Sequence, residues 1–335
     1  MKFCTLILNY LLITTLVNAQ NKEALLYYEA VNNAELSIVN RNTKDALRYY
    51  IKAFEINPKK PFSNDLYNAF HCAMDEKRYD LAQKYLYKNM DRGFQLELIT
   101  KYYSGEDLKV LDSIIKLHIP DKSLFNQALS LKIKKLSEWD SGVRKHSLES
   151  RPAGNYMTDS VYRIDQIITD SLFSLFTRHG AIPNQDVIGN TRNDPRVSPN
   201  YTIIILHHVL SINAGHRNDV FDTLAIKGIF EFNYHPKWFA GDFGQRANPM
   251  HKDSTVTYND LTVKFPLRIP INRLWHNIDM KDKKSTKYIK ALKEEQRIDN
   301  DRKKIGLSPL KSYWEIIEFI KSKPEPPFDK YSILL

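Results

Sequence analysis

The stretch "ALLYYEAVNNAELSIVNRNTKDALRYYIKAFEINP", residues 24–58, decides the fold of the N-terminal half. Alanine and aromatic residues recur along it at helical spacing. Asn57 and Pro58 close the pattern, because proline cannot continue a helix. The stretch therefore predicts a pair of packed helices, and a pattern of this kind calls for a search for further copies.

Four small or aromatic residues of this stretch fall where a tetratricopeptide repeat packs its two helices closely together. They are Ala34, Ala46, Tyr50 and Ala53. The stretch thus resembles a tetratricopeptide repeat, with two departures: Ser37 stands where that pattern favours tyrosine, and Ala30 where it favours tryptophan. The resemblance implies an antiparallel pair of helices.

Two further copies follow along the chain. In the second, residues 65–93, Ala82 lies 36 positions after Ala46 and takes the same place in the pattern. The third, near residues 95–118, is degenerate, with a turn expected at Gly105-Glu106-Asp107 before the amphipathic run "LKVLDSIIKL". Because one repeat cannot bury its own apolar face, the copies must stack on one another or on the rest of the chain.

The resemblance to tetratricopeptide repeats implies that the N-terminal half binds a protein or peptide in a concave groove. That implication comes from the resemblance and not from any residue of this chain. The alternative is that so few repeats only brace the C-terminal half. The sequence leaves both interpretations open.

Residues 1–19 have the pattern of a secretory signal peptide. Lys2 supplies the positive charge, an apolar stretch follows, and the small residue Ala19 precedes the expected cleavage before Gln20. The apolar stretch is shorter than the ~20 residues that span a bilayer. We therefore expect a periplasmic or secreted protein without a membrane span after cleavage.

The chain carries a formal charge of +10 and a hydrophobic content of 42% over 335 residues. This length is enough for two packed parts, which we place at residues 20–135 and 136–335. Much of the charge lies in residues 281–304, where acidic and basic side chains are interleaved as in a solvated helix. We therefore expect no nucleic-acid partner.

The C-terminal half reads as mainly helical with one small β-hairpin. Its clearest helix spans residues 158–180 and ends at Gly180. The apolar run within residues 199–213 fits either a helix or a buried strand. Alternating residues around Asn259 and Asp260 predict the hairpin. The predicted fold class is mostly α, with N-terminal helix-pair repeats packed against a mainly helical domain.

The same half resembles an uncharacterised bacterial domain family of unknown function. The resemblance is carried by the order of "HGAIP", "VIG", "IIILHH" and "DRKKIGLSPL", and it covers about residues 136–320. The matched positions are Asp140, Arg144, Asp165, Gly180, Pro183, Gly189, His208, Gly228, Arg302, Gly306 and Leu307. Two features depart from the family: "GAIP" replaces a direct Gly-Pro, and a Tyr-Gly-Thr-Gln segment is not recognisable. The resemblance favours a helix for residues 199–213.

Five matched residues are candidates for catalysis: Asp140, Arg144, Asp165, His208 and Arg302. Asp140 and Arg144 lie one helical turn apart and share a face. If the other three converge on them, the set supplies a base, an orienting carboxylate and two cations able to clamp a carboxylate or phosphate. The alternative, which we favour, is two structural ion pairs and a histidine in the core.

Motifs for metal and cofactor binding are not found in the sequence. It has no His-Glu-x-x-His, Gly-x-Ser-x-Gly or phosphate-loop pattern, so we expect no metal and no cofactor. Cleavage removes Cys4 and leaves Cys72 without a disulfide partner, so Cys72 and its neighbour His71 are predicted to be packing residues. Of His207 and His208, only one can lie on the apolar face of a helix.

Two functions are compatible with these features. The first is an exported interaction or scaffold protein whose helical repeats bind a protein or peptide. The second is a hydrolase-like enzyme of the cell envelope, with His208 as base and Arg144 or Arg302 as anion clamp. The two differ in whether those side chains meet in an open cleft.

Overall fold

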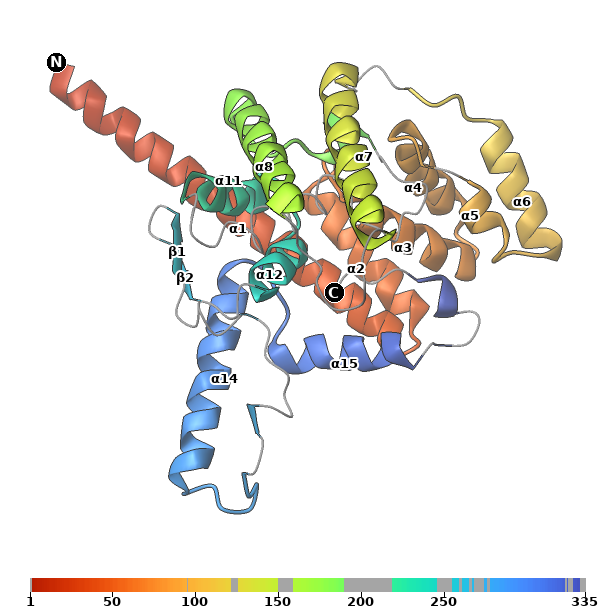
Figure 1. Ribbon diagram of the computed structural model, residues 1–335. Coiled ribbons are helices and arrows are strands. Elements are labelled where there is room, and N and C mark those ends of the chain that lie inside the picture. Colours follow the sequence, from red (N-terminus) through yellow and green to blue (C-terminus); the bar gives the residue numbers. More distant parts are fainter. Residues whose placement is uncertain are drawn as a thin grey trace.

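Helices make up most of the protein in the computed structural model, and the described residues contain one two-stranded antiparallel sheet (Figure 1). The structure describes residues 2–94, 96–121, 126–149, 159–189, 219–245, 255–258, 261–264, 267, 274–275, 278–322, 324 and 328–331. The mostly helical fold class predicted from the sequence is confirmed.

Four helices form the two N-terminal pairs (Figure 1). They are α1 (Lys2–Val39), α2 (Thr43–Ile56), α3 (Ser63–Asp75) and α4 (Tyr79–Asp91). α1 packs against α2 and α3 against α4, and α2 also packs against α3 and so joins the pairs. The helices predicted within residues 24–58 and 65–93 are therefore present and pack as neighbours.

Small buried residues let α1 and α2 approach closely. They are Ala30, Ala34, Ala46 and Ala53, all at most 2% exposed. The ring of Tyr50 is buried among the helices as well. Asn42 caps the start of α2, because its side-chain oxygen accepts the backbone N–H of Asp45 at 3.0 Å. The helix ends directly before Asn57 and Pro58, as the sequence predicts.

Two helices follow α4 in the region of the predicted third repeat. α5 (Glu97–Thr100) is a single turn, and α6 (Gly105–Lys116) is an amphipathic helix. The turn predicted at Gly105 is wrong by a few residues, because Gly105 already opens α6. Glu106 and Asp107 lie in the first turn of that helix, where its dipole favours acidic side chains.

The remaining elements follow α6 along the chain. The helices are α7 (Gln127–Glu149), α8 (Asp159–His179), α9 (Gln185–Ile188), α11 (Asp219–Phe230), α12 (Pro236–Gln245), α14 (Thr286–Lys304) and α15 (Leu310–Lys321), with a 3₁₀ turn η3 (Phe328–Lys330). The strands are β1 (Thr255–Tyr258) and β2 (Leu261–Lys264), which flank the predicted hairpin turn and place Tyr258 opposite Leu261. α7 runs without a break across the domain boundary predicted between residues 135 and 136.

α8 and α14 form where the sequence predicts helices. α8 buries Ile168, Leu172 and Phe176 along one stripe. It ends before Gly180, which has a positive φ of 74° and stops the helix. α14 is highly charged and exposes most of its residues, as expected for a solvated helix.

The two halves of the chain share one hydrophobic core. The hydroxyl of Tyr28 in α1 donates to the carbonyl of Ile229 in α11 at 2.6 Å. Further along α1, the side-chain amide of Asn32 donates to the carbonyl of Gly306 at 2.9 Å. Almost every residue of α3 is buried. The N-terminal helix pairs therefore brace the C-terminal half through direct contacts.

The predicted signal peptide forms the beginning of α1, and the helix continues past the expected cleavage position before Gln20. This end of α1 extends away from the other helices in Figure 1. Among the residues that the structure describes, no helix is both long enough and apolar enough to cross a membrane.

Candidate functional site

The candidate residues from the sequence lie on several elements. Asp140 and Arg144 are one turn apart on α7, and Asp165 is on α8, which packs against α7. Asp140 is buried. The side chains of Arg144 and Asp165, and the whole of His207 and His208, lie outside the described residues. The structure thus places the helices that carry Asp140, Arg144 and Asp165 side by side, and His208 lies outside the described residues.

Arg302 is almost completely buried near the end of α14. Its guanidinium donates to the carbonyl of Ser308 at 2.6 Å and to the carbonyl of Leu267 at 2.8 Å. It also lies over the ring of Tyr313, 4.9 Å from the ring centroid. The contacts with Ser308 and Tyr313 join α14 to the region of α15, and the contact with Leu267 joins it to the chain after β2. The described donors of Arg302 therefore serve the fold.

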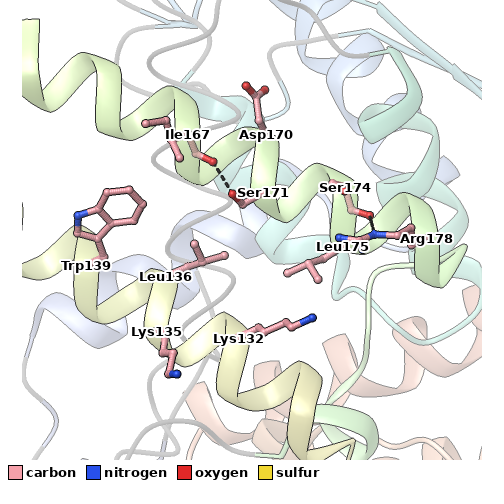
Figure 2. A pocket seen from close by; sticks show the side chains of 10 residues that line it. All are labelled: Lys132, Lys135, Leu136, Trp139, Ile167, Asp170, Ser171, Ser174, Leu175 and Arg178. Carbon is pink, nitrogen blue, oxygen red and sulfur yellow. Dashed lines mark hydrogen bonds between the residues drawn. The ribbon is translucent and has the colours of Figure 1, made fainter.

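A groove of about 650 Å³ lies between α7 and α8 (Figure 2). Its lining residues recur every three or four positions, because each helix turns one face toward it. They are Lys132, Lys135, Leu136 and Trp139 of α7 and Ile167, Asp170, Ser171, Ser174, Leu175 and Arg178 of α8. We call this site the α7–α8 groove.

The two ends of the α7–α8 groove differ in chemistry. Figure 2 shows Trp139 and Ile167 at one end, Lys132 and Arg178 toward the other, and Leu136 between them. Trp139 is 42% exposed and Ile167 is 43% exposed. The groove therefore offers open apolar surface next to positive charge, a combination found at protein interaction sites.

The polar groups of the groove leave an excess of positive charge. The lining cations are Lys132, Lys135 and Arg178, and Asp170 is the lining carboxylate. The hydroxyl of Ser171 is used by its own helix, because it donates to the carbonyl of Ile167 at 2.7 Å. Arg178 likewise donates to the carbonyl of Ser174 at 3.1 Å. Within the described residues, none of the three cations forms an ion pair with a carboxylate.

A second group of polar residues is buried where α1, α3 and α12 meet. Lys237 of α12 forms an ion pair with Glu35 of α1, and both side chains are almost completely buried. Tyr27 of α1 donates its hydroxyl hydrogen to Asp65 of α3 at 2.7 Å. His235, just before α12, is buried and accepts the backbone N–H of Lys237 at 3.1 Å. We call Glu35, Asp65, Lys237 and His235 the buried charge cluster.

Burial controls the protonation of this cluster. It raises the pKa of Asp65 to about 7, with nearby Glu35 adding to the rise and the Tyr27 hydrogen bond and Lys237 opposing it. Burial also raises the pKa of Glu35, against the charge of Lys237, and lowers the pKa of His235. One oxygen each of Glu35 and Asp65 lacks a hydrogen-bond partner among the described residues. A buried oxygen without a hydrogen bond lowers the stability of the fold. Because the pKa values of Asp65, Glu35 and His235 differ from their ordinary values, the free energy of unfolding depends on pH.

Asp65→Asn is expected to stabilise the protein at pH 8 and to have little effect near pH 4. The raised pKa means that the folded protein holds the Asp65 proton more tightly than the unfolded chain does. Stability from this group is therefore highest below the ordinary pKa of 3.8 and falls as the pH rises to about 7. At about 1.4 kcal/mol per pH unit, the free energy of unfolding falls by on the order of 4 kcal/mol over this range. Urea unfolding of both proteins from pH 4 to pH 8 measures it.

Asp112→Asn, on the exposed side of α6, is the matched control. It makes the same chemical change at the surface and should alter the free energy of unfolding by no more than about 0.5 kcal/mol at any pH. A loss of stability in Asp65→Asn that is equal at pH 4 and pH 8 would contradict the expectation, because folded Asp65 would then be as acidic as in the unfolded chain.

His71 and Cys72 are buried in α3, as predicted for packing residues. The Nδ1 of His71 and the hydroxyl of Tyr103 are hydrogen-bonded at 2.5 Å, and burial lowers the pKa of His71. Burial raises the pKa of the Cys72 thiol, which disfavours the reactive thiolate. In the part of the chain that the structure describes, no group of three or more His, Cys, Asp or Glu side chains could hold a metal ion.

The residues of the α7–α8 groove were not among the sequence candidates. The one feature of the sequence that could have indicated the groove is Trp139, which shares a helix face with Lys132 and Lys135. That face becomes a site only because α8 lies beside it, and the sequence does not specify this packing.

No protein-family model matches the chain, and no match is found among curated proteins or among solved structures. Function is therefore inferred from the geometry of the chain itself.

Proposed function

We propose that this chain is an exported protein-interaction protein whose α7–α8 groove binds an acidic amphipathic helix of a protein partner. One observation carries the proposal: the open apolar surface of Trp139 and Ile167 lies beside three cations that have no carboxylate partner among the described residues. The α7 side of the groove runs from Lys132 to Trp139, about 10 Å at 1.5 Å per residue. That length accommodates about two turns of a partner helix.

Trp139 is the anchor of the proposed site. Tryptophan is enriched among the few residues that carry most of the binding energy of an interface. At 42% exposure, a large part of its indole can still be removed from water. The half-buried Leu136 lies between the two ends, the half-buried Leu175 lies beside Lys132 and Arg178, and both supply further apolar contact. Covering this surface is favourable at roughly 25 cal/mol per Å² of apolar area.

The cations of the groove decide the charge of the partner. Lys132, Lys135 and Arg178 outnumber the carboxylate of Asp170, so an acidic segment is attracted and a basic one is repelled. Charges at an exposed site are screened over about 8 Å at physiological ionic strength. Binding should therefore weaken as salt is added, and the apolar anchor should account for what remains.

The surfaces of the N-terminal helix pairs are a less suitable place for a partner. α1 packs against α11 and α15, and almost all of α3 is buried. The surface of α1 is therefore used to hold the C-terminal half, and α3, which packs against α2 and α4, has little exposed surface left. This is why we place the partner on α7 and α8 and assign a bracing role to the repeats.

The hydrolase alternative has less support in the described part of the chain. It needs Arg144 or Arg302 as an anion clamp beside His208. The guanidinium of Arg302 is buried and donates to two backbone carbonyls. An interaction protein is therefore the function that the described geometry supports better.

Trp139→Ala is expected to weaken binding of an acidic amphipathic peptide by about tenfold or more, as truncation of an interface anchor does. The probe is a synthetic helix with leucines three and four residues apart and glutamates on both flanks. Fluorescence anisotropy at low ionic strength measures its affinity. Lys135→Glu should also weaken binding and reduce its dependence on salt.

Two control variants change the same kinds of side chain outside the groove. Ile289→Ala removes an apolar side chain on α14 that is 42% exposed, and Lys134→Glu reverses a charge on α7 that does not line the groove. Both should leave the affinity within about twofold of the unchanged protein. The proposal fails if a basic peptide binds as tightly as the acidic one, or if Ile289→Ala weakens binding as much as Trp139→Ala.

A further inference from the structure

A second concave site, with a volume of about 580 Å³, lies on one face of α4. It shares no lining residue with the α7–α8 groove. α4 and its C-terminal cap contribute Lys84, Tyr87, Lys88, Asp91 and Arg92, and the other lining residues are Lys59, His118, Asp121 and Asp186. We call this site the α4 pocket.

Three carboxylates line the α4 pocket, those of Asp91, Asp121 and Asp186, and the contacts of Asp91 and Asp186 fix their positions. The buried guanidinium of Arg92 forms an ion pair with Asp186 at 2.7 Å. Asp91 is hydrogen-bonded to the Nε2 of His118 at 2.7 Å and accepts the backbone N–H of Asp121 at 2.9 Å. These contacts fix both carboxylates in the wall of the pocket, so neither is paired with a lysine.

Beside Arg92, three lysines supply positive charge to the pocket. Lys59 and Lys84 are exposed, and neither has an ion-pair partner among the described residues. Lys88 is held in place, because its Nζ donates to the carbonyls of Pro58 and Lys59 at 2.8 Å each. Carbonyl groups carry no full charge, so these bonds position the ammonium without neutralising it.

The electrostatics of Lys88 fit a pocket whose carboxylates do not neutralise this ammonium group. Burial, followed by the charge of Arg92, lowers its pKa to about 8. Lys84 acts in the same direction, and Asp186 and Asp91 only partly oppose it. An anion bound beside Lys88 would favour its charged form.

We propose that the α4 pocket binds the phosphate group of a small phosphate monoester, held by Lys59, Lys84 and Lys88. Lysine is a common phosphate-binding residue because its ammonium acts as a compact point charge. A phosphate monoester carries about −1.5 to −2 charges at neutral pH. It therefore complements three lysines better than a ligand with a single carboxylate group would. A volume of about 580 Å³ lies in the usual range of small-molecule sites.

The test uses inorganic phosphate as the first probe and isothermal titration calorimetry at pH 8. Lys88→Met is expected to weaken binding about tenfold, because it removes a positioned cation. If Lys88→Met does not fold without its two carbonyl contacts, Lys84→Met takes its place, since the exposed Lys84 has no described fold contact. Lys84→Met should weaken binding by about threefold or more.

The proton on Lys88 gives a second readout. Near pH 8 about half of this side chain is uncharged before binding, so a bound anion should draw in up to about half a proton. Titrations in two buffers with different enthalpies of ionisation measure this uptake. Nonspecific attraction of phosphate to exposed lysines, which are already fully charged at pH 8, would not produce this proton uptake.

Lys52→Met is the matched control, because Lys52 is an exposed lysine on α2 that does not line the pocket. It should leave the affinity within about twofold. Equal weakening by Lys52→Met and Lys84→Met overturns the proposal, and so does the absence of phosphate binding at about 10 mM.

Two larger probes then identify the source of the phosphate. Glucose 6-phosphate represents a small metabolite, and a phosphoserine tripeptide represents a phosphorylated protein. The proposal requires glucose 6-phosphate to bind at least as tightly as inorganic phosphate and to lose affinity in Lys84→Met. Binding of the phosphopeptide alone overturns the assignment to a small molecule.

Discussion

Gly306→Ala is expected to destabilise the protein by roughly 2–5 kcal/mol. Gly306 has a φ of 79°, in the left-handed region that costs an alanine about 1–2 kcal/mol. A β-carbon there would also lie 2.6 Å from Cδ2 of Tyr28 and 2.7 Å from its Cβ. Tyr28 has no room to move, because its ring is buried and its hydroxyl bonds to the carbonyl of Ile229. Overpacking of this kind adds about 1–3 kcal/mol.

Gly105→Ala separates the two costs. Gly105 also has a positive φ, of 58°, but an added β-carbon there meets no atom within 4 Å. This variant should therefore lose only the backbone cost of about 1–2 kcal/mol. Urea unfolding of both variants gives the contact cost as a difference. Equal losses would mean that Gly306 does not lie against Tyr28 and that α1 is not closely packed on the end of α14.

The N-terminal helix pairs could be predicted because their signals are local. Ala46 and Ala53 recur at helical spacing, and Pro58 stops the second helix, whatever the rest of the chain does. The same holds for the hairpin, whose alternation around residues 259–260 spans only a few positions. Elements of this kind carry their own pattern of apolar and turn-forming residues.

The buried charge cluster could not be predicted in the same way. Glu35 and Asp65 are acidic residues on helices, and such residues are mostly exposed in proteins. Lys237, the partner of Glu35, lies 202 positions further along the chain. These positions become internal only through the packing of α1, α3 and α12 in the fold, and no periodicity within a single helix reveals that packing.

The candidate site shows the same limit. Asp140 and Arg144 share a helix face, which spacing alone reveals. The burial of Arg302 against backbone carbonyls depends on the course of the chain after α14, and no motif indicates it. The exposure of Trp139 is also a tertiary property, because a tryptophan on a helix is more often buried in a core.

Lys237→Met is expected to destabilise the protein by about 3–5 kcal/mol, because it leaves the carboxylate of Glu35 buried without its cation. Glu35 is fully buried, and its second carboxylate oxygen already lacks a partner among the described residues. In the variant, Glu35 can avoid the buried charge only by taking up a proton. The loss should therefore be larger at pH 8 than at pH 5, which denaturant unfolding at the two pH values measures.

The double variant Glu35→Leu/Lys237→Met distinguishes the stranded charge from lost packing. Replacing both members of a buried ion pair by apolar residues is often neutral or stabilising, so most of the stability should return. Lys134→Met breaks the exposed pair with Glu138 on α7 and should lose no more than about 1 kcal/mol. A double variant as unstable as Lys237→Met would show that the lysine stem, and not the charge, holds α12 on α1. Recovery would mean that the Glu35–Lys237 ion pair is not needed to join the N-terminal helix pairs to the C-terminal half, and that apolar packing can replace it at this position.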